Sequence, residues 1–158
     1  MKANQKSVVV WVDADACHVK DEIVRVCHRY GVETRFVSNK VLKGFTGRRN
    51  VTVITVPGGL DAADNYVVEH VQPGDLVLTG DIPLASRVLE AGAAALDFRG
   101  RWFTEDNIGG LVASRDLHHH LRGSGVLTDG PRSPGHADRS RLLQELNNFL
   151  DRTKASAC

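Results

Sequence analysis

The chain of 158 residues has little of several features that would assign it to a class at once. Its three cysteines are odd in number, and their spacing matches no zinc-binding motif. Twenty basic and 19 acidic side chains leave a net charge of +1, so bulk charge does not indicate a nucleic-acid-binding protein, and any such surface must be local. No apolar stretch is long enough to span a bilayer, so we expect no membrane partner.

We also expect no signal peptide. Residues 1–7 contain Lys2 and Lys6, but the apolar run that follows is short and ends in acids at Asp13. We therefore expect a cytoplasmic protein. The length predicts a single domain over residues 1–158, and 42% apolar with 25% charged residues is ordinary for a globular protein.

Apolar runs and helical patterns alternate at short spacing through the first hundred residues. Such alternation is typical of right-handed βαβ units, in which helices cover both faces of a parallel sheet. We therefore predict an α/β fold, a three-layer sandwich with a mostly parallel central sheet of about five strands. The predicted strands cover residues 8–12, 34–37, 51–56, 75–79 and 93–98, and the predicted helices cover 19–30, 61–71 and 83–91.

The last third of the chain has a different character. Residues 99–103 predict a small extension, and apolar positions over 107–122 predict a helix. Residues 123–138 are rich in Gly, Pro and Ser and predict a flexible loop. An amphipathic pattern then predicts a C-terminal helix over 139–153.

Acidic residues occur where predicted strands end or helices begin. The carboxyl ends of parallel strands share one edge of a sheet, where ligands bind in open α/β folds, so several of these acids are expected to converge. Crowded carboxylates repel one another unless some are protonated or cations lie between them. An all-oxygen ligand set favours Mg²⁺ or Mn²⁺. The acids are Asp13, Asp15, Asp61, Asp64, Asp81 and Asp97.

Each acid could also have a purely structural role instead of binding a metal ion. Asp61 and Asp64 fit the start of a helix as a cap and a first-turn charge, and Asp81 before Pro83 fits a second cap. Asp75 and Asp97 are expected to be strand-end residues that face solvent. Asp13-Ala14-Asp15 fits these alternatives least, because it directly follows the buried run Val8–Val12.

Basic residues gather at two places. Lys20 lies in the first turn of the predicted helix after the Asp-Ala-Asp segment. The connection 39–50 is basic around Phe45, which suits a phosphate backbone with one stacked base. A solvated loop explains the same residues equally well. The candidate nucleic-acid contacts are Lys20, Lys40, Lys43, Arg48 and Arg49.

The ordered motifs of the chain resemble the YaiI/YqxD family, a widespread bacterial group with a PIN-like (NYN-like) fold. The resemblance runs over nearly the whole length, with His18 at the position where the family usually has Pro. The motifs that carry it include Trp11-Val12-Asp13-Ala14-Asp15-Ala16-Cys17, Asp61-Ala62-Ala63-Asp64, Gly74–Ala85, Arg99-Gly100 and Asp138-Arg139.

This resemblance implies a PIN-like nuclease ancestry, in which acids at strand ends bind Mg²⁺ or Mn²⁺ and RNA is hydrolysed. The implied metal ligands are Asp13, Asp15, Asp61, Asp64 and Asp81; Asp13, Asp15 and Asp81 are the expected catalytic residues, and no organic cofactor is expected. Two alternatives stay open. One is a phosphatase of the haloacid dehalogenase type, with Asp13 as nucleophile and Asp15 as general acid. The other is a non-catalytic module that binds metal and RNA.

Overall fold

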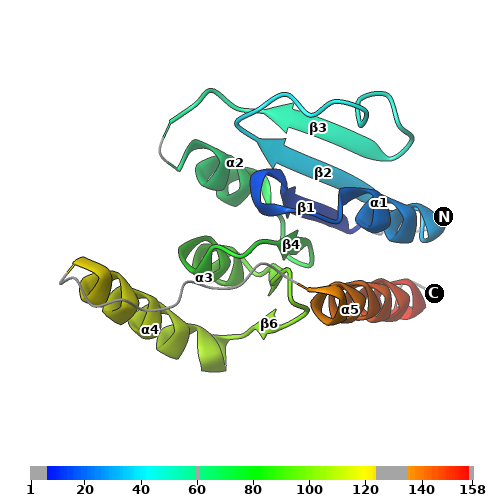
Figure 1. The fold of residues 1–158 in the computed structure, drawn as a ribbon. Coiled ribbons are helices and arrows are strands. Elements are labelled where there is room, and N and C mark those ends of the chain that lie inside the picture. The colour runs from blue at the N-terminus through cyan, green and yellow to red at the C-terminus, as the bar shows by residue number, and fades with distance from the viewer. Residues whose placement is uncertain (1–6, 60, 124–134, 157–158) are drawn as a thin grey trace.

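The computed structural model describes residues 7–59, 61–123 and 135–156 and has the predicted α/β architecture (Figure 1). A six-stranded sheet has the order β3-β2-β1-β4-β5-β6, in which all neighbours are parallel except the last pair. The predicted extension at 99–103 is the short antiparallel strand β6. The strands are β1 (Val9–Asp13), β2 (Glu33–Ser38), β3 (Val51–Thr55), β4 (Leu76–Leu78), β5 (Ala94–Leu96) and β6 (Trp102–Phe103).

Helices cover both faces of the sheet, which gives the predicted three layers. They are α1 (Lys20–Arg29), α2 (Ala62–His70), α3 (Ile82–Glu90), α4 (Glu105–Gly123) and α5 (His136–Ser156), with a 3₁₀ turn, η1 (Ala14–Ala16), after β1. Within the described ranges, no helix combines the length and the apolar character needed to cross a bilayer.

Strand β1 lies at the centre of the sheet and is buried on both faces. Val10 and Val12 point into the layer formed by α1 and α5, whereas Trp11 points into the layer that contains α2 and α3. All three side chains are at most 1% exposed. The alternation of side chains along a strand explains why a continuous apolar run is needed here: both sides of β1 face a core.

The C-terminal helix begins earlier than predicted. The composition of 123–138 predicts a loop, but α5 starts at His136, and Gly123 is the last residue of α4. The backbone N–H of Gly135 donates to Asp138 Oδ2 at 3.1 Å, which is half of a capping box and satisfies one donor at the start of the helix. The rest of the predicted loop, 124–134, lies outside the described residues.

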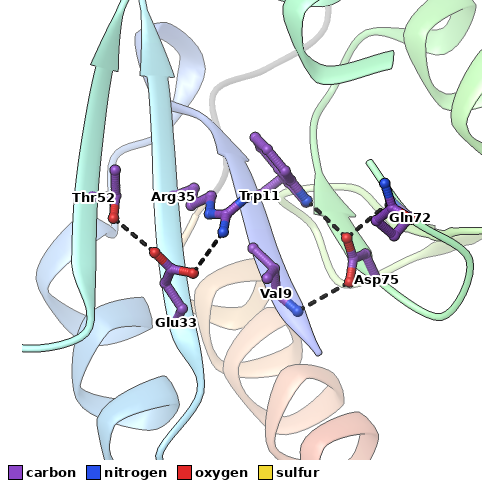
Figure 2. A network of polar contacts seen from close by, with 7 residues as sticks. All are labelled: Val9, Trp11, Glu33, Arg35, Thr52, Gln72 and Asp75. Atoms are coloured by element: carbon purple, nitrogen blue, oxygen red, sulfur yellow. Dashed lines mark hydrogen bonds and ion pairs between the residues drawn. The ribbon is translucent and has the colours of Figure 1, made fainter. Parts of the chain in front are cut away.

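Asp75 does not face solvent as expected; it is 2% exposed. It immediately precedes β4, and its carboxylate accepts hydrogen bonds from Val9 N (3.1 Å), Trp11 Nε1 (3.1 Å) and Gln72 N (3.0 Å) (Figure 2). Three donors offset the cost of burying the charge. Asp75 therefore ties β1 to β4 at the amino edge of the sheet, opposite the edge where the other acids lie.

Candidate active site

The acids lie where the order of the strands reverses. From β1 the chain passes to α1 on one face of the sheet, whereas from β4, the neighbour of β1, it passes to α3 on the other face. Such a reversal leaves a crevice between the carboxyl ends of the two strands, where open α/β sheets bind their ligands. Asp13 is the last residue of β1 and stands at this point.

A chain of hydrogen bonds joins Asp13 to Asp81. The hydroxyl of Thr79 donates to Asp13 Oδ2 at 3.2 Å and accepts from the backbone N–H of Asp81 at 3.0 Å. Asp81 Oδ1 in turn accepts from Leu84 N at 3.0 Å, so the predicted helix cap is present. The cap uses one carboxylate oxygen, and Oδ2 has no hydrogen bond to a described residue.

Asp15 is held on the other side of Asp13. It lies in η1 and is exposed, and its carboxylate accepts from Ser38 Oγ at 2.6 Å and from Asn39 N at 3.1 Å. Ser38 is the last residue of β2 and Asn39 follows it, so these bonds fix Asp15 toward β2 and away from β4. The short contact with a fully buried hydroxyl gives Asp15 a defined position.

Asp61 and Asp64 come from the start of α2. Asp61 occupies the capping position, but its side chain makes no capping hydrogen bond, in contrast to the predicted cap. Its backbone has a φ of 62°, a left-handed conformation that costs a non-glycine residue about 1 kcal/mol. Asp64 follows three residues later and is half-buried, and no described residue donates a hydrogen bond to its carboxylate.

The charges that shift the pKa values of Asp13 and Asp64 indicate which acids lie close together. Burial raises the pKa of Asp13, the Thr79 hydrogen bond opposes this, and the charges of Asp15 and Asp81 raise it further. Burial, together with the charges of Asp81, Asp13 and Asp61, raises the pKa of Asp64 to about 6, against an opposing effect of Arg87. Asp13, Asp64 and Asp81 therefore form one cluster of neighbouring carboxylates, with Asp61 and Asp15 at its sides; we call this cluster the acidic pocket.

The raised pKa of Asp64 predicts a pH-dependent stability. A carboxyl group whose pKa in the folded protein lies above its ordinary value of 3.8 binds its proton more tightly in the folded state. Its contribution to the free energy of unfolding is therefore stabilising in acid and is lost as the pH rises through about 6. We expect Asp64→Asn to stabilise the metal-free protein at about pH 7.5 by roughly 1 kcal/mol, a value that allows for solvent screening. The gain should shrink toward pH 5, as measured by urea unfolding.

Asp61→Asn is the matched control for this experiment, because Asp61 belongs to the same turn and is exposed. Its effect on the free energy of unfolding should be smaller and should change little over the same pH interval. The free energy of unfolding of Asp64→Asn and of the wild type could instead differ by the same amount at both pH values. Burial would then not penalise the ionised form of Asp64, and this result would remove Asp64 from the acidic pocket.

The carboxylates converge without forming a closed ligand shell. Among the described residues, no three His, Cys, Asp or Glu side chains are placed so that they hold one metal ion together. Two restraints account for this spacing: Asp15 is bonded toward Ser38, and Asp81 caps α3. Mutual repulsion also keeps uncompensated carboxylates apart.

The five basic candidates do not form one surface. Lys20 and Lys40 lie near the acids, since Lys20 begins α1 and Lys40 follows β2. Arg49 lies two residues before β3, at the opposite edge of the sheet, one strand length or about 17 Å away. Lys43 is exposed in the loop between them.

Phe45 and Arg48 are used in packing. Phe45 packs against Phe36, with ring centroids 5.2 Å apart, so it is not free to stack on a base in this conformation. The guanidinium of Arg48 lies 4.5 Å from the centroid of the Phe45 ring and pairs with Asp21 at 2.9 Å. The loop is therefore anchored to α1.

Asp97 and Cys17 have structural roles near the same edge. Asp97 Oδ1 accepts from Arg99 N at 2.8 Å and Arg101 N at 2.9 Å, which shapes the turn between β5 and β6. Burial raises the pKa of Cys17 to about 11, so it is a neutral thiol and a poor nucleophile at physiological pH.

Sequence reasoning missed Ser38 and Thr79, whose hydroxyls orient Asp15 and Asp13. Both are 0% exposed. Each directly follows the apolar residues of a strand at the carboxyl edge, and each lies beside a polar turn. A hydroxyl at the last position of an otherwise apolar strand is the signal that was available, although a single Ser or Thr carries little weight without the neighbouring strand.

The fold and the pocket together define a class: a three-layer α/β protein with an acidic crevice at the switch point of its sheet. The sequence profile of the YaiI/YqxD family, described as uncharacterised, matches residues 11–152. The chain belongs to this family. The matched segment spans every acid of the pocket and every strand except the first two residues of β1.

Curated relatives support the assignment over almost their full length. A UPF0178 protein of Caulobacter sp. (strain K31) is 49% identical over 142 residues, which cover 90% of this chain and 93% of the relative. A UPF0178 protein of Parvibaculum lavamentivorans is 48% identical over 89% of this chain and 92% of the relative. A UPF0178 protein of Chromobacterium violaceum is 42% identical over 92% of this chain and 99% of the relative. No solved structure matches the chain.

Proposed function

We propose that this protein is a metal-dependent nuclease of PIN-like ancestry that hydrolyses RNA phosphodiester bonds. The observation that carries the proposal is the acidic pocket of Asp13, Asp64 and Asp81 at the sheet's switch point. In the absence of cations the ionised carboxylates of Asp13 and Asp64 destabilise the fold, since burial and nearby negative charges raise their pKa values. A pocket that costs stability is expected to serve binding.

The donor set fits a hard divalent cation. All the candidate ligands are carboxylate oxygens, and Cys17, the nearby thiol, is buried and neutral, which favours Mg²⁺ or Mn²⁺ over softer metals. Asp13 together with Asp64 or Asp81 would hold the ion, with Asp61 and Asp15 at the sides. When bound, such an ion supplies an activated water and neutralises charge on the phosphoryl group.

The residues around the pocket already orient its central carboxylates. Thr79 fixes Asp13 Oδ2, and the α3 cap fixes Asp81 Oδ1, so each side chain keeps its other oxygen available. Mg²⁺ is usually bound through one or two carboxylates, with water and substrate phosphate completing the shell. A widely spaced set of acids is compatible with that kind of site, and a closed protein cage is not required.

Cationic side chains at the same edge suit an RNA strand. Lys20 at the start of α1 and the exposed Lys40 after β2 border the acids and would neutralise phosphates on either side of the bond to be cleaved. Lys43, Arg48 and Arg49 lie farther along the loop, and the side chain of Arg48 is paired with Asp21. We assign the phosphate contacts near the pocket to Lys20 and Lys40.

Incubation of the purified protein with single-stranded and structured RNA tests this function. With Mn²⁺ or Mg²⁺ we expect shortened RNA products on a denaturing gel, and EDTA should abolish them because the carboxylates cannot neutralise phosphate charge themselves. An RNA pool left intact in Mn²⁺ at high protein concentration would contradict a nuclease.

The two alternatives receive less support from the geometry. A phosphatase of the haloacid dehalogenase type needs Asp15 as a general acid, but its carboxylate is bonded to Ser38 and Asn39. A phosphoaspartate analogue trapped at Asp13 would favour that reaction nonetheless. A non-catalytic module would show tight RNA binding in Mn²⁺ without products, and the gel assay separates it from the nuclease.

A further inference from the structure

A small pocket opens beside the acids, on the α1 and α5 face of the sheet. It is lined by His18, Val19, Phe98 and Arg139, which come from three separate segments of the chain. His18 and Val19 connect η1 to α1, Phe98 follows β5, and Arg139 lies in the first turn of α5. None of the five acids lines it, so it is distinct from the acidic pocket.

The guanidinium of Arg139 in the lining of the pocket favours binding of an anion. Arg139 is exposed and makes no ion pair with a described residue, and His18 is likewise exposed. The nearby acid, Asp138, is engaged: its Oδ2 accepts from Gly135 N at 3.1 Å and lies 3.9 Å from Arg99 Nη1. Val19 and Phe98 form an apolar wall, which lowers the local dielectric and strengthens the pairing of an arginine with a phosphate.

The position of the pocket connects it to the site of cleavage. The ring of Phe98 lies close to Gly80, where an added Cβ would be 3.9 Å from Phe98 Cδ2, and Gly80 directly precedes Asp81. Asp13 ends β1 and Phe98 follows β5. These strands are separated by β4, so two strand spacings, roughly 10 Å, separate the two chain segments along the sheet edge. A strand held by the acids therefore reaches the pocket within a short stretch.

Helix α5 borders one side of the pocket, where it contributes Arg139. Gly100 has a φ of 81°, and a Cβ there would lie 2.7 Å from the backbone carbonyl carbon of Arg141 and 2.8 Å from Leu142 N. The turn after β5 thus packs directly on the α5 backbone, so the chain itself occupies that side of the pocket. A recess of this form admits the end of a strand.

We propose that this pocket binds the terminal phosphate of the RNA strand, with Arg139 and His18 as its cationic contacts. The inference rests on the proposed function, because it takes the bound strand to be the RNA cleaved at the acids. Its consequence is a preference for RNA ends that carry a monophosphate, and for cleavage close to that end.

Binding of short oligoribonucleotides in EDTA tests the pocket without any cleavage. We compare one sequence with a 5′-phosphate, a 3′-phosphate or only hydroxyl ends, labelled internally, by fluorescence anisotropy. One phosphorylated form should bind about tenfold more tightly than the hydroxyl form, the gain expected for hydrogen bonds to a charged group. Which end gives the gain identifies the source of the phosphate.

Arg139→Ala should remove this preference, whereas Arg152→Ala should keep it, because Arg152 is an exposed arginine farther along the same helix. His18→Gln should reduce the preference, because the substitution removes the imidazole from the lining of the pocket. Equal or undetectable affinity for all three oligonucleotides, or equal effects of the two arginine variants, would overturn the proposal.

The outcome is separable from that of the nuclease assay. A protein that prefers phosphorylated ends but never cleaves RNA in Mn²⁺ would retain the phosphate pocket and lose the nuclease. A protein that cleaves RNA regardless of its ends, with no effect of Arg139→Ala on binding, would retain the nuclease and lose the phosphate pocket.

Discussion

Asp13→Asn is expected to reduce Mn²⁺-dependent RNA cleavage by about 100-fold or more, which corresponds to about 2.7 kcal/mol of transition-state stabilisation. Asp13 ends the central strand, is restrained by Thr79 and lies between the charges of Asp15 and Asp81. The substitution keeps the size of the side chain and removes its charge. Initial rates on one RNA substrate, at matched protein concentration, measure the effect.

The same variant should be more stable than the wild type when no cation is present. Burial raises the pKa of Asp13, so its ionised form is a cost that asparagine removes. This combination of lost activity and gained stability distinguishes a functional carboxylate from a structural one. Asp106→Asn, an exposed acid at the start of α4, is the matched control and should change neither quantity. Full activity in Asp13→Asn would refute the assignment of the site.

Asp75→Ala should lower the free energy of unfolding by about 3–5 kcal/mol, because it leaves three donors without their shared acceptor. Val9 N, Trp11 Nε1 and Gln72 N all donate to this carboxylate in a buried environment (Figure 2). A loss of that size is a third or more of the stability of a typical domain. Urea unfolding followed by the fluorescence of Trp11 and Trp102 measures it.

Asp75→Asn is the informative companion. Its amide oxygen still accepts, but its NH₂ group faces a donor, so the loss should be smaller than for alanine yet clearly measurable. Because the network lies at the amino edge of the sheet, neither variant should alter RNA cleavage per folded molecule. A destabilisation below about 1 kcal/mol in Asp75→Ala would show that water replaces the carboxylate, and that Asp75 is not the buried junction described here.

Much of the site could be predicted because it depends on rules that act locally. The run Val8–Val12 indicates a strand buried on both faces, and parallel strands place the residues that follow them at one edge. Asp13 and Asp81 are placed correctly by this argument alone. The order of the strands depends on pairing between distant segments, such as β1 with β4, which no local pattern encodes.

Several predicted roles were wrong because the side chain has a hydrogen-bonding or packing partner elsewhere in the chain. An aspartate at a strand boundary usually faces solvent, but the burial of Asp75 depends on the indole N–H of Trp11, which is 64 residues away in the sequence. The predicted cap of α2 by Asp61 is wrong, because its left-handed backbone leaves the carboxylate without a capping bond. Arg48 and Phe45 are candidates for RNA contacts by sequence, but each has a partner within the fold.

A cation among Asp13, Asp64 and Asp81 is the central requirement of the proposed site, and anomalous diffraction from crystals grown with Mn²⁺ tests it directly. We predict an anomalous peak within coordinating distance of Asp13 and at least one of the other two carboxylates, and its loss in crystals of Asp13→Asn. Well-ordered crystals with Mn²⁺ in excess and no peak at this edge of the sheet would contradict the proposal.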